Sequence, residues 1–277
     1  NCESIQDLVQ KCEIISLLIP DQIMGAVYSQ NIAPYLTEGK SLLFSHGYNI
    51  HYKLIQPPEF VNVIMAAPSG AGSELRKQYK AGRGIPGLFA IEQDYTGDCR
   101  EVALSYCRAI GLTRMGVFES TFKEETETDL FGEQSVLCGG LSSLILAGFE
   151  TLTEAGYPPE MAYFECCHEV KLIVDLIYEG GISTMRYSIS DTAKYGDITR
   201  GPRIIDSEVK ARMKKILKDI QSGEFAKEWV AENESGRPNY NRLLKEGENH
   251  PIEAIGNTLR SMMTPLFKRR LVDKTKN

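Results

Sequence analysis

The chain has 277 residues and a net charge of −6, with 42% apolar and 25% charged residues. These proportions are typical of a globular protein, and the length suits one large domain or two ordinary ones. The negative charge argues against a nucleic-acid-binding protein, because such proteins usually carry a basic stripe. No uninterrupted apolar run approaches the roughly 20 residues that span a membrane. The composition thus predicts neither a nucleic-acid partner nor a membrane partner.

Seven cysteines are scattered along the chain without a CxxC motif. An odd, unpatterned set suits reduced thiols better than a disulfide framework. The cysteines therefore indicate a cytoplasmic protein.

The first 120 residues alternate short apolar runs with helical patterns, which predicts a mostly parallel sheet covered on both faces. The expected strands are 14–20, 41–47, 61–68, 87–93 and 114–120, with helices over 22–35, 73–81 and 99–110. Ligands bind at the carboxyl ends of the strands in such sheets. Those ends carry the polar stretches "PDQ", "SHG", "APSGAG" and "EQD". We expect them to form one site.

After about residue 121 the strand signals stop and helical spacing takes over. The stretch "YPPEMAYFECCHEVKLIVDLIYEGG" opens with proline and closes on Gly180 and Gly181, as helices do. Residues 207–223 form an amphipathic pattern. The sequence therefore predicts an α/β domain over 1–120 and an all-α domain over 121–277.

Two carboxylate pairs, Asp129/Glu133 and Glu165/Glu169, stand four residues apart in the helical half. Members of such a pair share one helix face and repel each other unless something compensates. Oxygen ligands without a His/Cys cluster favour Mg²⁺ or Mn²⁺ over zinc. The residues alone leave two interpretations open: a divalent-metal site, or a solvated face paired with lysines such as Lys123 and Lys171.

Three further features carry weaker signals. A lone histidine is more often structural, but His46 follows an expected strand and precedes a glycine, a location that makes a functional role more plausible. The turn "APSGAGSELR" (67–76) can receive a phosphate at a helix N-terminus but lacks both nucleotide-binding glycine motifs. Ser190 suits a helix cap better than a ligand contact.

Long blocks of the sequence resemble the ketol-acid reductoisomerase family, in particular its short, class I form. The resemblance rests on "FKEETETDLFGEQSVLCGG", "AGFETLTEAGYPPEMAYFECCHEVKLIVDLIYEGGI" and "MRYSISDTAKYGD", with agreement in "SHGYNIHY", "HPIEAIG" and the tail "LVDKTKN". It covers essentially the whole chain. It implies a Rossmann-like N-terminal domain, a knotted helical C-terminal domain, and a homodimer or higher homo-oligomer.

The resemblance also implies an activity. Such enzymes convert acetolactate and acetohydroxybutyrate, small 2-acetohydroxy acids, to dihydroxy acids in valine and isoleucine synthesis, using NADPH and two Mg²⁺ ions per site. By resemblance, Glu165 and Glu169 complete the metal site from the neighbouring subunit. The implied site residues are Asp129, Glu133, Glu165 and Glu169 for metal, His46 for catalysis, Ser190 for the substrate carboxylate, and Asp21, Gln22, Ile23, Met24 and Gly72 for the cofactor.

The chain departs from the family in two places. The glycine-rich fingerprint is absent, so we expect roughly sixty residues of the dinucleotide fold to be missing before Asn1, with weak or no NADPH binding. Ser69 stands where the family has a lysine, and a hydroxyl cannot replace that charge. Arg76 or Lys77 offers compensation. The alternative to an active enzyme is an impaired or non-catalytic relative that keeps the helical dimer and the metal site.

Overall fold

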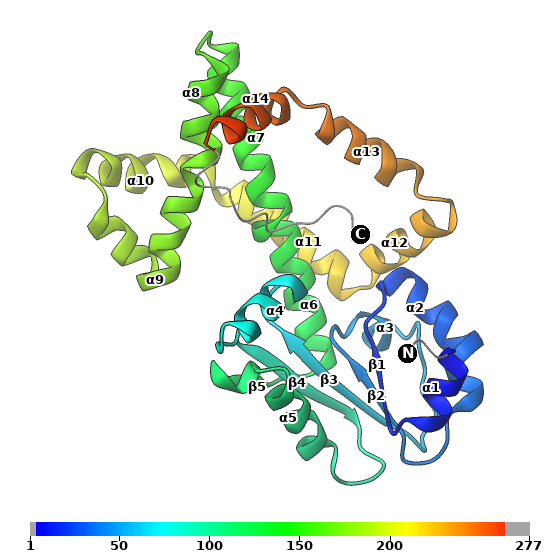
Figure 1. Ribbon diagram of the computed structural model, residues 1–277. Helices are drawn as coiled ribbons and strands as arrows, with labels where there is room; N and C mark the ends of the chain where they lie inside the picture. The colour runs from blue at the N-terminus through cyan, green and yellow to red at the C-terminus, as the bar shows by residue number, and fades with distance from the viewer. Residues whose placement is uncertain (1–3, 264–277) are drawn as a thin grey trace. The chain divides into compact units, whose positions relative to one another are not determined.

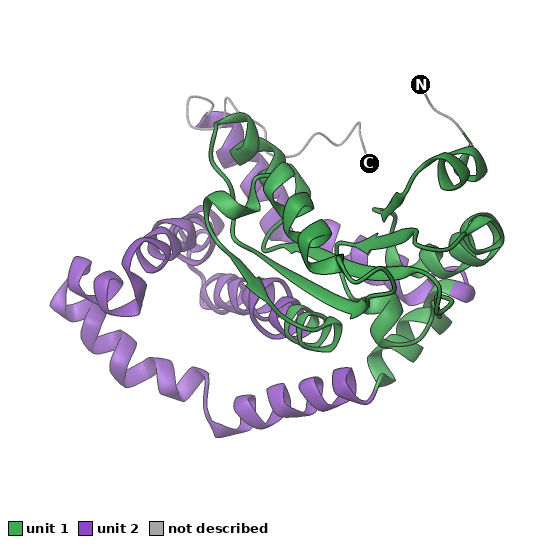
Figure 2. Ribbon diagram, turned by 90° about the horizontal axis from the view of Figure 1, so that it is seen from below, with its two compact units in different colours: residues 1–130, 223–233 green, residues 131–222, 234–277 purple. Residues whose placement is uncertain are grey.

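The computed structural model describes residues 4–263, so the tail 271–277 lies outside the described residues. By contacts the chain divides into two compact units, coloured separately in Figure 2. Unit 1 comprises residues 1–130 and 223–233, and unit 2 comprises 131–222 and 234–277. The domain boundary at residue 120 stays a prediction.

Unit 1 is built on a five-stranded sheet of order β1-β2-β3-β4-β5. β1, β2 and β3 are parallel, β4 is antiparallel to β3, and β5 is parallel to β4. The expected strands and the parallel-dominated, Rossmann-like sheet are confirmed. The elements are α1 (Ile5–Lys11), β1 (Ile14–Leu17), α2 (Asp21–Val27), η1 (Tyr28–Ile32), η2 (Ala33–Tyr35), β2 (Ser41–Phe44), α3 (Tyr48–His51), β3 (Asn62–Pro68), α4 (Gly72–Lys80), β4 (Gly87–Gln93), α5 (Cys99–Ala109), η3 (Leu112–Arg114), β5 (Val117–Glu119) and α6 (Phe122–Gly132).

Alternate residues of the central strands belong to two buried clusters, one on each face of the sheet, and helices cover both faces (Figure 1). Leu42 and Phe44 face the cluster formed with α1, α2 and α6, whereas Leu43 and Ile64 face α5. This alternation follows from the two-residue period of a strand, and burial on both faces explains why the runs are continuously apolar. The sheet therefore has helices on both faces, as predicted.

Unit 2 is helical throughout its described residues, which confirms the expected change of class. Its elements, with one that spans both units, are η4 (Glu133–Leu137), α7 (Gly139–Glu154), α8 (Pro159–Tyr163), η5 (Phe164–His168), α9 (Val170–Ser188), α10 (Asp191–Ile204), α11 (Ser207–Gln221), α12 (Glu224–Glu234), α13 (Pro238–Glu248) and α14 (Pro251–Met262). The expected helix stop is a break inside α9, where Gly181 adopts φ 80° and ψ 177°.

The buried core of unit 2 joins three helices, α7, α8 and α14, through five side chains. Arg260 donates to the Tyr163 hydroxyl at 2.8 Å, which ties α14 to α8. His250 caps α14 through Nδ1, which accepts from the Ile252 amide at 3.2 Å, and its Nε2 lies 3.1 Å from Glu150 Oε1. The polar contacts thus fix α14 where the apolar contacts are few.

One helical stretch of the described residues, Phe122–Glu154, is long and apolar enough to cross a membrane by length and composition alone. It contains 33 residues, and only 6% of its apolar window is buried. This stretch is not apparent in the sequence, because polar residues interrupt each of its apolar runs. One such helix is weak support for a membrane span, since it passes a test of composition only.

Candidate active site

Three strand ends meet at one edge of the sheet. β1, β2 and β3 are parallel and in register, so the segments at Asp21, His46 and Ser69 follow them at the same edge. The prediction that these loops gather is therefore confirmed for three of the four stretches.

The fourth stretch, "EQD", lies at the opposite edge, and its assignment to the site is wrong. β4 is antiparallel to β3, and Gln93 pairs with Val63 near the start of β3. Beyond it, the amides of Tyr95 and Thr96 donate to Asn62 Oδ1 at 2.9 and 3.1 Å. An apolar run of strand length does not reveal its direction, which is why the sequence misled here.

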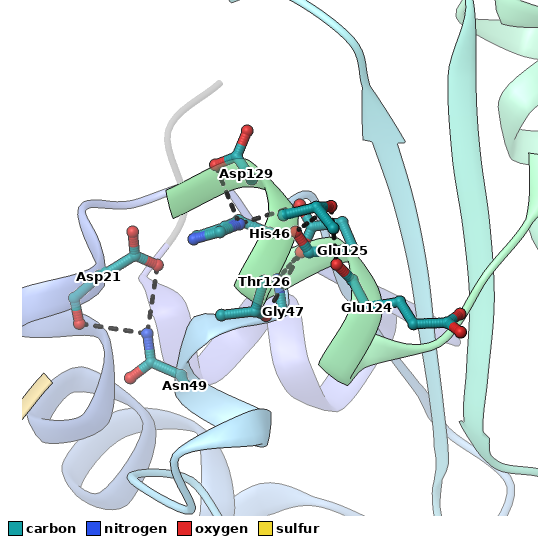
Figure 3. A network of polar contacts seen from close by, with 9 residues as sticks. Asp21, His46, Gly47, Asn49, Glu124, Glu125, Thr126 and Asp129 are labelled. Atoms are coloured by element: carbon teal, nitrogen blue, oxygen red, sulfur yellow. Dashed lines mark hydrogen bonds and ion pairs between the residues drawn. The ribbon is translucent and has the colours of Figure 1, made fainter. Parts of the chain in front are cut away.

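His46 is held by a buried carboxylate on α6 (Figure 3). Its Nδ1 lies 2.9 Å from Glu125 Oε1, and the other carboxylate oxygen accepts from the Gly47 amide at 2.8 Å. Asp129 Oδ2 is 3.6 Å from the same His46 nitrogen. Glu125 is 5% exposed, so its charge depends on these donors. The three side chains form a compact His–carboxylate group at the end of β2.

Gly47 makes this close approach possible. A Cβ at position 47 would lie 2.4 Å from Thr126 Oγ1 and 2.7 Å from the Phe122 carbonyl oxygen. Both distances are below any normal contact, and the second involves backbone that cannot swing aside. Only glycine therefore lets the His46 turn lie against α6.

The carboxylates determine the protonation of His46. Burial opposes the charged ring and lowers its pKa, but the hydrogen bond to Glu125 and the charges of Glu125, Asp21 and Asp129 outweigh burial. Together they raise the pKa of His46 from 6.5 to about 9. The ring is an imidazolium near neutral pH, with Nδ1–H donated to Glu125.

A second histidine of the same turn behaves differently. His51 Nε2 lies 3.4 Å from Glu127 Oε1, and Glu127 is buried. Here burial is the larger effect and lowers the pKa of His51, only partly offset by Glu127. His51 is therefore neutral where His46 is charged.

The two predicted carboxylate pairs lie at turns of unusual geometry. η4 and η5 are π-helical turns, and they begin at Glu133 and contain Glu165, respectively. π-Turns inside helices are frequent at functional sites. Glu165 and Glu169 line one cavity of about 330 Å³. Lys171 pairs with Asp175 instead, which removes one of the lysines expected to neutralise that face.

Two glycines after η4 are required by its geometry. A Cβ on Gly139 would lie 2.3 Å from the Gln134 carbonyl oxygen, and one on Gly140 would lie 2.1 Å from that of Ser135. The wider π-turn directs these oxygens at the following turn. A Cβ on Gly132, by contrast, would make only ordinary contact with Leu137, at 3.7 Å.

The donor set suits a hard divalent cation. The predicted ligands Asp129, Glu133, Glu165 and Glu169 are all solvent-exposed carboxylates, able to exchange water for metal. His46, Glu125 and Asp129 also place ligand atoms within 4.8 Å of one another. Apart from His46, the donors are all carboxylate oxygens, so Mg²⁺ fits better than zinc.

The remaining predicted residues lie at the starts of helices, and their roles stay predictions. Asp21–Met24 open α2, and Gly72 opens α4 and lines a cavity of about 420 Å³ with Arg76. Ser190 caps α10, accepting from the Ala193 amide at 3.2 Å. Lys77, one candidate to compensate for Ser69, is paired with Glu74 at 3.1 Å.

The site residues predicted from the sequence do not include Glu125. A signal was present, because Glu125, Asp129 and Glu133 follow one another at four-residue intervals and so mark one helix face. Glu127 gave no such signal. Its burial depends on how α6 packs against α3.

Comparisons with known proteins agree with this geometry. The family model for the ketol-acid reductoisomerase C-terminal domain matches residues 122–265, and that for the acetohydroxy acid isomeroreductase NADPH-binding domain matches residues 1–116. The chain is 50% identical to an NADH-preferring ketol-acid reductoisomerase from an uncultured archean, over 93% of this chain and 78% of that one, with a TM-score of 0.91.

Two more distant structures share the fold. A putative oxidoreductase from Jannaschia sp. CCS1 is 13% identical over 77% of this chain and 78% of that one, with a TM-score of 0.56. A semialdehyde dehydrogenase NAD-binding protein from Cupriavidus necator is 16% identical over 80% and 82%, with a TM-score of 0.59.

Proposed function

The chain belongs to the ketol-acid reductoisomerase family of branched-chain amino acid biosynthesis, and from this premise we propose its reaction. It catalyses a Mg²⁺-dependent alkyl shift in acetolactate or acetohydroxybutyrate, followed by reduction of the 2-keto acid to a 2,3-dihydroxy acid. The observation that carries the proposal is the His46–Glu125–Asp129 group at the carboxyl edge of the sheet.

Four carboxylates would hold the metal: Asp129 and Glu133 from one subunit, and Glu165 and Glu169 from its partner in a homodimer. When bound, Mg²⁺ supplies Lewis-acid polarisation and a template for the substrate oxygens. Asp129 is half exposed, so its oxygens are accessible to a metal ion. Glu125 is buried and instead holds His46 through its hydrogen bond. The oligomer and these assignments are our proposals.

His46 serves as an orienting and proton-holding group rather than as the sole base. Its Nδ1 is committed to Glu125 Oε1 at 2.9 Å, and the carboxylates around the ring raise its pKa and so favour the protonated form. In that form the ring presents Nε2–H as a donor toward the substrate oxygens. Ser190, already a cap, would offer its hydroxyl to the substrate carboxylate.

The redox partner is a nicotinamide dinucleotide held by Asp21–Met24 and Gly72. One matching family model describes an NADPH-binding domain, whereas the 50% identical structure is an NADH-preferring enzyme. We propose NADPH. Isothermal titration of this chain with NADPH and with NADH tests it, and tighter binding of NADH than of NADPH would contradict it.

An impaired relative is the second candidate, and Ser69 favours it. Position 69 is exposed just after β3, at the same edge as His46, and carries a hydroxyl instead of a cation. Ser69→Lys should raise turnover if the missing charge limits the reaction. Equal turnover of both forms would remove Ser69 as an explanation for low activity.

A coupled assay tests the function directly. The chain is given acetolactate, Mg²⁺ and either NADPH or NADH, and substrate-dependent oxidation of the nucleotide is recorded with and without EDTA. We expect oxidation that EDTA abolishes. Mg²⁺ binding by the carboxylates without any turnover would favour the non-catalytic relative.

A further inference from the structure

Asn49 connects the two sides of the proposed site. It lies in the middle of α3, directly after the His46–Gly47 turn, and is 1% exposed. Its Nδ2 donates to Asp21 twice, to the main-chain oxygen at 3.2 Å and to Oδ1 at 3.3 Å (Figure 3). Asp21 opens α2, whose N-cap Pro20 makes no side-chain capping bond.

The chemistry of the contact fixes the orientation of the amide. A carbonyl oxygen and a carboxylate oxygen only accept, so the NH₂ group must face Asp21. The other end, Asn49 Oδ1, is buried and has no hydrogen-bond partner in the part of the chain that is described. An orphaned buried oxygen is unfavourable. An apolar side chain at this position would avoid that cost. The advantage of an asparagine here is therefore the two hydrogen bonds that its NH₂ group donates to Asp21.

The residues on both sides of Asn49 are held against α6. Glu125 accepts from His46 and from the Gly47 amide, while His51 lies against Glu127. α3 is only four residues long and is held at both sides of Asn49. A shift of Asp21 relative to His46 therefore requires the Asn49 bonds to break.

We propose that Asn49 is a positioning residue for the redox step, which sets Asp21 and the start of α2 at a fixed place relative to His46. The inference rests on the proposed function, because it takes Asp21–Met24 as the segment that contacts the nicotinamide. Asn49 thereby keeps the nicotinamide ring aligned with the substrate. Misplacement of about 1 Å in such a site can cost about a hundredfold in rate.

The test compares Asn49→Ala with Asn62→Ala. Asn62 is also a buried asparagine, 2% exposed, and its Nδ2 donates to Ser41 and Thr96 at the opposite edge of the sheet. Both variants should lower the melting temperature. Only Asn49→Ala should speed amide hydrogen exchange in residues 20–27 and raise the dinucleotide Kd and KM, by about tenfold, with Mg²⁺ affinity within about twofold of wild type.

Asp21→Ala removes one acceptor from the other end and guards against a failure of Asn49→Ala to fold. A double-mutant cycle of the two changes should be non-additive in dinucleotide affinity. Additive effects would overturn the proposal. So would unchanged exchange over 20–27 in Asn49→Ala, or the same exchange in Asn62→Ala.

The outcomes separate the inference from the proposed function. If the wild-type chain binds NADH or NADPH but does not turn over acetolactate, the reaction is wrong and the positioning role still stands on exchange and affinity. If it binds neither nucleotide, the positioning role is overturned, because α2 then holds no cofactor.

Discussion

The two units bury apolar surface in different ways. Unit 1 encloses both faces of its sheet, and many of its core side chains are completely buried, Leu42, Phe44 and Ile64 among them. Among its described residues, unit 2 has one buried cluster of five side chains. Its large exposed apolar side chains include Leu137, Leu144, Leu172, Ile182, Tyr178, Tyr187 and Ile198.

The difference shows where apolar surface is left over. A chain folding alone seldom leaves so many large apolar side chains in water, and such faces mark sites of association. We propose that the exposed faces of unit 2 contact a second copy of the chain, as the proposed metal site with carboxylates from two subunits requires.

The largest expected effect is on assembly. Leu144 on α7 is 51% exposed, and Leu144→Glu would place a charge on the proposed contact. We expect monomers by light scattering and loss of activity, because the carboxylates of the shared site separate. Lys214→Glu, on the polar face of α11, is the control and should leave the oligomer intact. An unchanged oligomer in Leu144→Glu, or co-sedimentation of the wild type with lipid vesicles, would refute this use of the helix.

A core substitution in unit 1 should lower the stability of the fold and leave the oligomer intact. Phe44 is fully buried and packs edge-on against Phe122 at 6.0 Å. Phe44→Ala should lower the free energy of unfolding by about 3–5 kcal/mol through the cavity it leaves. Urea unfolding measures this, with Phe118→Ala, at an exposed ring, as the control. At low urea, where the chain stays folded, the oligomer of Phe44→Ala should persist. Dissociation there would mean that a change in the core of unit 1 also weakens assembly.

A smaller effect is expected from Glu125, the buried carboxylate that holds His46. Glu125→Gln keeps the shape but loses the charge beside His46, and should lower kcat by about 10–100-fold, as loss of a supporting carboxylate does. Glu124→Gln on the same helix alters an exposed carboxylate and should leave kcat unchanged. Equal kcat in wild type and Glu125→Gln would remove Glu125 from the site.

The smallest effect concerns alkaline pH. Burial raises the pKa of Cys99 to about 12 and that of Cys107 to about 11, from an ordinary value of 9.0. The unfolded chain therefore loses these protons first, so the stability that the two thiols contribute is constant below pH 9 and is lost as the pH rises toward 11 and 12. Urea unfolding between pH 9 and pH 10.5, above the range in which His46 titrates, should show this fall. Cys99→Ala should flatten it, and an equal slope would contradict the assignment.

The sequence predicts the strands well because short apolar runs between Gly and Pro have few alternatives. It placed His46 at the end of β2 and Ser190 at a helix start for the same local reasons. The direction of β4, the burial of Glu125 and Glu127, and the π-turns depend on contacts between distant segments, and no local pattern encodes them. The metal and cofactor roles of the named residues stay predictions.

The π-turn η4 has a consequence for sequence variation. It contains one more residue than an α-helical turn would need, so deleting a single codon within 133–137 would restore an ordinary α-helical turn. Gly139 and Gly140 would then be free to vary, because the carbonyl oxygens opposing them would be gone. In an alignment, a one-residue gap here accompanied by larger residues at 139 and 140 would mark relatives that have given up this carboxylate geometry.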